Sequence, residues 1–113
     1  MQAQHTYQLR PGYGSKELLL EFTSSNDYKL VVKNILEVFD KLDLKQKNEE
    51  LLLDDQLIHF IGQNGEVTLN IDNWENIFIL GGKNQKDILL IDKALDNSSL
   101  FKKQQVNFED YTL

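Results

Sequence analysis

The chain has 113 residues, with 12 basic and 18 acidic side chains and a net charge of -6. That length fits a single domain spanning residues 1–113. The acidic balance argues against direct binding of nucleic acid, because neutralising a phosphate backbone requires clustered Lys and Arg. Cysteine is absent, which excludes disulfide frameworks, zinc–thiolate sites and Cys nucleophiles.

The first residues are polar, and no apolar run exceeds four residues, as in Ile77–Leu80. A signal peptide needs a basic segment followed by an apolar one. A helix that crosses a bilayer needs about 20 apolar residues. We therefore expect a cytoplasmic protein that does not enter a membrane.

The first predicted element is a hairpin. His5–Arg10 and Glu17–Thr23 form its strands, and Pro11–Gly14 holds residue types that favour a turn. Alternate residues of the second strand are apolar and define one buried face: Leu18, Leu20 and Phe22.

A helix is predicted next. Ser24–Asp27 offers side-chain oxygens that can cap its first backbone N–H groups. Apolar residues then recur at spacings of three and four, which is typical of a helix packed in the core: Tyr28, Val31, Val32, Ile35, Phe39 and Leu42. Lys45–Asn48 is polar and is predicted to be the loop that leaves the helix. Periodicity leaves Leu51–Leu53 open between a short strand and the start of a longer one.

A second hairpin is predicted from Gln56 to Ile71. It turns at Asn64-Gly65, the dipeptide most suited to a two-residue type I′ turn because both positions tolerate positive φ. That turn sets the pairing, with His59 opposite Asn70. One face then carries Ile58, Phe60, Val67, Leu69 and Ile71. The other carries Leu57, His59, Ile61, Glu66, Thr68, Asn70 and Asp72.

A strand at Asn76–Leu80 and a second helix follow. This helix begins at Asn84 or Gln85 and ends at Asn97–Ser99, and residues 102–113 either add an edge strand or stay loose. The order strand, strand, helix, strand, strand, strand, helix predicts a two-layer α+β domain. Its sheet is mainly antiparallel with about five strands, and both helices pack on one face. The first helix can act as a right-handed crossover, which would make one strand pair parallel.

Known catalytic motifs are missing from the sequence. Gly81-Gly82-Lys83 occupies the place of a phosphate loop, but its glycines are adjacent and the Walker pattern separates them. His59 is the better of the two histidines for acid–base chemistry, yet a strand carries it away from Asp55. Glu49-Glu50 and Asp54-Asp55 lack the ligand spacing of a calcium loop. We therefore predict a protein that is not an enzyme and holds no cofactor or metal.

The negative charge is concentrated in one stretch. Residues 48–82 contain seven carboxylates and no Lys or Arg. This stretch includes the second hairpin and Trp74, so carboxylates lie beside apolar side chains such as Leu57 and Ile61. Such a surface suits protein binding, because acidic groups steer a basic partner and apolar anchors supply affinity. Alternatively, the first hairpin or the C-terminal residues cover these side chains, and Trp74 is equally compatible with the core.

We predict a small non-enzymatic inhibitor of a basic protein, such as a bacterial immunity protein that neutralises a toxin, for example a nuclease. In size and charge the chain resembles such immunity proteins. The predicted partner-binding residues are Glu66, Asp72, Trp74, Glu75, His59 and Asn70. Two alternatives stay open. One is a structural or regulatory subunit that forms homo-oligomers through a sheet edge or its C-terminal segment. The other is an enzyme or ligand carrier whose pocket joins His59 to two carboxylates.

Overall fold

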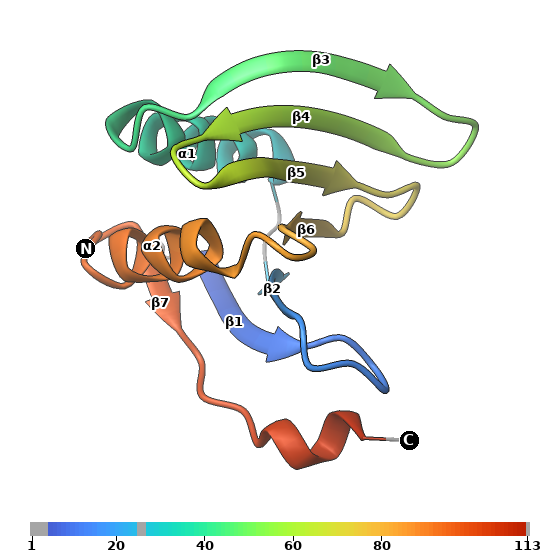
Figure 1. The fold of residues 1–113 in the computed structure, drawn as a ribbon, viewed down its shortest axis with the longest axis vertical. Coiled ribbons are helices and arrows are strands. Elements are labelled where there is room, and N and C mark those ends of the chain that lie inside the picture. The colour runs from blue at the N-terminus through green and yellow to red at the C-terminus, as the bar shows by residue number, and fades with distance from the viewer. Residues whose placement is uncertain (1–4, 25–26, 113) are drawn as a thin grey trace.

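The structure is a computed structural model that describes residues 5–24 and 27–112. Its strands form one seven-stranded sheet in the order β3-β4-β5-β6-β2-β1-β7 (Figure 1). The strands are β1 His5–Pro11, β2 Leu18–Ser24, β3 Lys45–Leu51, β4 Gln56–Gly62, β5 Gly65–Ile71, β6 Ile77–Leu80 and β7 Phe101–Lys103. The helices are α1 Tyr28–Lys41, α2 Gln85–Asp96 and the 3-10 helix η1 Phe108–Tyr111.

Both long helices cover the same face of the sheet. The Phe60 ring on β4 packs edge-on against the Phe39 ring on α1, with 4.9 Å between their centroids. At the other side of the sheet, the Tyr7 hydroxyl on β1 donates to Asp92 on α2. The strand pairings place Phe60 and Tyr7 on one face. The predicted α+β class is therefore confirmed.

The first helix packs as its apolar spacing predicts. Its buried side chains include Val31, Ile35 and Phe39, which join the core cluster beneath the sheet. The Asp27 carboxylate accepts a hydrogen bond from the Leu30 N–H at 3.3 Å and so caps the helix start. The helix ends before Asp43, which adopts a φ of 60°.

The expected count of five strands is wrong, because two more strands lie at the edges of the sheet. Lys45–Asn48, predicted to be a loop, forms the first part of β3. All residues of β3 are exposed, so this strand has no buried face and therefore no apolar alternation to reveal it. The other addition, β7, pairs with β1 and is the parallel neighbour. α1 joins β2 to β3, which are not adjacent in the sheet.

The hairpin of β4 and β5 keeps its predicted faces, but its predicted turn is wrong. Gly62 pairs with Gly65, so Gln63-Asn64 forms the turn and His59 lies opposite Thr68. The pairing moves by two residues, which leaves each side chain on its original face. Asn64 supplies a physical reason, since its backbone and side-chain N–H groups both donate to Asp87 of α2. A contact distant in sequence thus selects the turn.

The C-terminal residues return to the first hairpin. The N–H of Gly14 donates to the carbonyl of Tyr111 at 2.8 Å. The Arg10 guanidinium lies over the rings of Tyr13 and Tyr111, 5.4 Å and 5.0 Å from their centroids, and its Nε is 2.6 Å from a carboxylate oxygen of Glu21. These contacts hold η1 beside β1, on the face opposite the helices.

Candidate functional site

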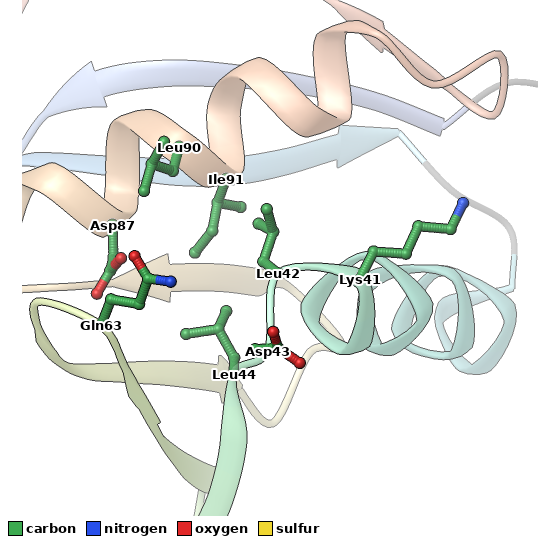
Figure 2. A pocket seen from close by; sticks show the side chains of 8 residues that line it. All are labelled: Lys41, Leu42, Asp43, Leu44, Gln63, Asp87, Leu90 and Ile91. Atoms are coloured by element: carbon green, nitrogen blue, oxygen red, sulfur yellow. The ribbon is translucent and has the colours of Figure 1, made fainter.

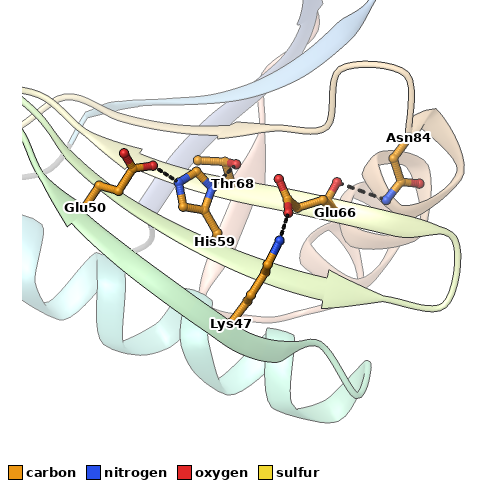
Figure 3. A network of polar contacts seen from close by, with 6 residues as sticks. All are labelled: Lys47, Glu50, His59, Glu66, Thr68 and Asn84. Carbon is orange, nitrogen blue, oxygen red and sulfur yellow. Dashed lines mark hydrogen bonds and ion pairs between the residues drawn. The ribbon is translucent and has the colours of Figure 1, made fainter.

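The open face of the sheet, turned away from the helices, carries a polar network (Figure 3). Lys47 Nζ on β3 lies 3.0 Å from Glu66 Oε2 on β5. His59 Nε2 on β4 lies 2.7 Å from Glu50 Oε1, and its Nδ1 lies 2.9 Å from Thr68 Oγ1. Because an ionised carboxylate only accepts, Nε2 of His59 carries the hydrogen. The structure thus joins two predicted binding residues to Lys47 and Glu50, which the prediction left out.

Lys47 compensates part of the acidic stretch. Lys47 stands just before residue 48, but the antiparallel pairing of β3 with β4 brings the Lys47 Nζ to Glu66 on β5. The hydrogen bond from Lys47, together with its positive charge, lowers the pKa of the Glu66 carboxyl. Glu66 is therefore ionised and has a counter-ion that its own stretch of sequence does not contain.

The network has the order hydroxyl, imidazole, carboxylate that hydrolases use for a nucleophile, a base and an orienting acid. The surroundings of these side chains differ from those of a hydrolase active site. The side chains of Thr68, His59 and Glu50 lie along the sheet face (Figure 3), and the backbone N–H groups of β4 and β5 belong to the strand ladder. Hydrolysis needs donors aimed at the reacting oxygen. We infer that these side chains stabilise the pairing of β3, β4 and β5.

A second group of predicted residues lies at one end of the sheet. There the β3–β4 loop, residues 52–55, and the β5–β6 loop, residues 72–76, lie side by side (Figure 1) and line a hollow of about 270 Å³. Leu53 is 98% exposed and Trp74 is 78% exposed. We call the following residues the loop-end surface: Leu52, Leu53, Asp54, Asp55, Asp72, Trp74 and Glu75.

Hydrogen bonds fix the loop that carries Trp74. One carboxylate oxygen of Asp72 accepts from the backbone N–H groups of Trp74 and Asn76, each at 2.9 Å. The other accepts from the Asn76 side chain at 3.1 Å. Glu75 adopts a φ of 66°, which few residues other than glycine do. The Trp74 indole is thus presented to solvent from an ordered backbone, and its assignment to the core is ruled out.

Asn70 on β5 contacts the β3–β4 loop from the sheet. Its side chain is buried, and Nδ2 donates to Asp55 Oδ2 at 3.2 Å. The amide therefore positions Asp55 within the loop-end surface. The structure brings Asp72, Trp74 and Glu75 together with Asn70 behind them, and places His59 and Glu66 in the separate network on the open face.

A cavity of about 270 Å³ lies where the end of α1, the start of α2 and the β4–β5 turn meet (Figure 2). Asp87 is only 5% exposed there and accepts from Asn64 N at 3.1 Å, Asn64 Nδ2 at 3.0 Å and Asn84 Nδ2 at 2.8 Å. The two bonds from Asn64 tie the hairpin to α2. Asp43 also lines this cavity and His59 does not, so it is not the expected pocket that joins His59 to two carboxylates.

Sequence reasoning missed several contributors to these surfaces, among them Lys47, Glu50 and Leu53. Lys47 and Glu50 were hidden because β3 was not recognised as a strand. Leu53 had a usable signal, since three leucines stand directly before two aspartates, with no alternating pattern to bury them. An apolar run followed at once by paired charges is compatible with an exposed loop as well as with a strand.

No family model, curated protein or solved structure matches this chain. Within residues 5–24 and 27–112, no helix is long and apolar enough to cross a membrane. The same residues include no group of three or more His, Asp or Glu side chains placed to hold a metal ion. Function is therefore inferred from the two surfaces alone.

Proposed function

We propose that this protein, without being an enzyme, binds a basic protein and inhibits it through the loop-end surface. The observation that carries the proposal is the Trp74 indole, 78% exposed on a hydrogen-bonded loop among carboxylates. Trp is among the residue types most enriched at the energetic centres of protein interfaces. Because the loop is already ordered, binding through it sacrifices little backbone entropy.

The charges of the loop-end surface select the partner. Asp54, Asp55 and Glu75 come from the stretch 48–82, which contains no Lys or Arg. Carboxylates placed around an apolar anchor accelerate association with a basic surface and oppose binding to an acidic one. Leu53 and Trp74 then supply the area that is removed from water, while the carboxylates set orientation.

A bacterial immunity protein acting on a toxin fits this proposal. A nuclease toxin has a basic site that binds phosphates, and a surface of carboxylates can occupy such a site in their place. The small size of the chain and its net charge of -6 support the assignment. A cytoplasmic location belongs to the same proposal.

The experiment measures binding and inhibition of a basic nuclease that co-purifies with the full chain from its native source. Trp74→Ala is expected to weaken binding by about 2 kcal/mol, roughly 30-fold, because it removes the central anchor. Asp54→Lys is expected to weaken binding and to reduce its dependence on salt. Leu89→Ala, which truncates an exposed leucine of α2, serves as the matched control and should bind normally.

Unchanged affinity and inhibition in both Trp74→Ala and Asp54→Lys would contradict the proposal. Glu66→Lys separates the two surfaces, since loss of binding in that variant alone would assign the partner to the open sheet face. Asp72 is kept unchanged in every variant because its carboxylate holds the loop. Circular dichroism verifies that each variant is folded.

A further inference from the structure

β3 is the longer free edge of the sheet. It is the outermost strand on its side, as Figure 1 shows, and all seven of its residues, Lys45–Leu51, are exposed. The strand at the opposite edge, β7, has three residues. A free edge carries backbone N–H and C=O groups that can pair with another strand. Charged side chains on an edge strand oppose its pairing with most other strands. The order of the charges on β3 therefore indicates which strand can pair with it.

The charges of β3 change sign at its middle. Lys45 and Lys47 lie in its first half, and Glu49 and Glu50 lie in its second half. A parallel copy of the strand would place like charges opposite one another, which is unfavourable. An antiparallel copy brings the half of each strand that carries lysines alongside the half of the other that carries glutamates. The edge is therefore complementary to itself, as a twofold-symmetric interface requires.

In one register no like charges lie opposite one another, and opposite residues lie on the same face of the sheet. With Lys45 opposite Glu50 of the copy, Gln46 lies opposite Glu49 and Lys47 lies opposite Asn48. Lys45 and Glu50 both lie on the open face, since they pair with Ile61 and Leu57 of β4. Gln46 and Glu49 both lie on the helix face, since they pair with Phe60 and Ile58. The irregularity between Gln46 and Asn48 falls at the twofold axis, so each regular half meets a regular half.

We propose that β3 pairs antiparallel with β3 of a second copy of this chain, about a twofold axis at Lys47–Asn48. The two seven-stranded sheets then form one continuous sheet. The two copies of Trp74 lie at opposite ends of the dimer. The dimer therefore does not depend on the proposed inhibitory function.

The test is sedimentation equilibrium of the full chain from about 10 μM to about 1 mM, a range that detects dissociation constants of weak dimers. The unaltered chain should show a monomer–dimer equilibrium. Lys45→Glu and Glu50→Lys should each weaken the dimer about tenfold or more, because each replaces two attractive pairs by two repulsive ones. An equimolar mixture of these two variants should form a heterodimer with the original affinity, since all of its pairs are attractive again.

Lys16→Glu and Glu17→Lys are matched controls. They make the same charge changes at exposed residues outside the strands and should leave dimerisation unaffected. A chain that stays monomeric across the concentration range overturns the proposal. It is also overturned if the two β3 variants dimerise as the unaltered chain does, or if their mixture forms no heterodimer. Restored pairing in the mixture shows that both variants are folded.

Discussion

Asp87 offers the sharpest test of how the fold is held together. Asp87→Ala removes a buried carboxylate that accepts three hydrogen bonds, two from Asn64 and one from Asn84. Bonds to charged groups contribute about 1.5–3 kcal/mol each, toward the lower limit where water reaches the donors. Because these three bonds are only partly buried and come from two donor residues, their contributions do not simply add. We expect the free energy of unfolding to fall by about 2–4 kcal/mol. Loss of a negative charge in the first turn of α2 adds a few tenths of a kcal/mol.

Urea denaturation and thermal unfolding, followed by circular dichroism, measure this loss. For a domain of this size, about 2–4 kcal/mol corresponds to a fall in Tm of roughly 8–16 °C. Asp40→Ala is the control, because it removes an exposed carboxylate from α1, and it should change stability by less than about 0.5 kcal/mol. If Asp87→Ala is no more destabilised than the control, the hydrogen bonds between the hairpin and α2 do not stabilise the fold as argued.

Two further changes test the first strand. Burial, followed by the charge of Asp92, raises the pKa of the Tyr7 hydroxyl above its ordinary value of 10.0. The contribution of Tyr7 to the free energy of unfolding is therefore complete below about pH 10 and is lost as the pH rises further. Tyr7→Phe should lower stability by about 1 kcal/mol at pH 7 and flatten the decline above pH 10 in pH-dependent denaturation; a decline as steep as before would refute the assignment to Tyr7. Tyr111→Ala removes one of the two rings stacked on Arg10 and should make the C-terminal segment more sensitive to limited proteolysis, with a stability loss of about 1 kcal/mol. Equal cleavage rates in this variant and the unaltered chain would show that the stacking does not hold the segment.

Periodic burial made much of the fold predictable. The faces of the second hairpin and the buried stripe of α1 follow from apolar residues at periods of two and 3.6, because each element has one dry side. Leu69 and Ile35 are both completely buried, as expected. β3 lacked this signal because it has no buried face. The turn at Gln63-Asn64 was mispredicted because Asp87, distant in sequence, selects it.

The candidate site was predictable only in part. Asp72, Trp74 and Glu75 are close together because they are close in sequence, and local chemistry was enough to group them. Their juxtaposition with Leu53 and Asp55 depends on which strand ends meet at one end of the sheet, and strand order is not encoded locally. Exposure of Trp74 was likewise undetermined, since a tryptophan stabilises a core and an interface equally well.

The position of β1 has a consequence for how the chain folds. β1 comes first in the sequence, yet one of its two neighbours is β7, which pairs through bonds such as His5 N–H to the Leu100 carbonyl at 2.9 Å and Gln104 N–H to the Tyr7 carbonyl at 2.8 Å. During synthesis the sheet therefore stays incomplete until almost the whole chain has emerged. A chain that ends before Phe101 keeps β1 as an unprotected edge strand, which favours aggregation through strand pairing.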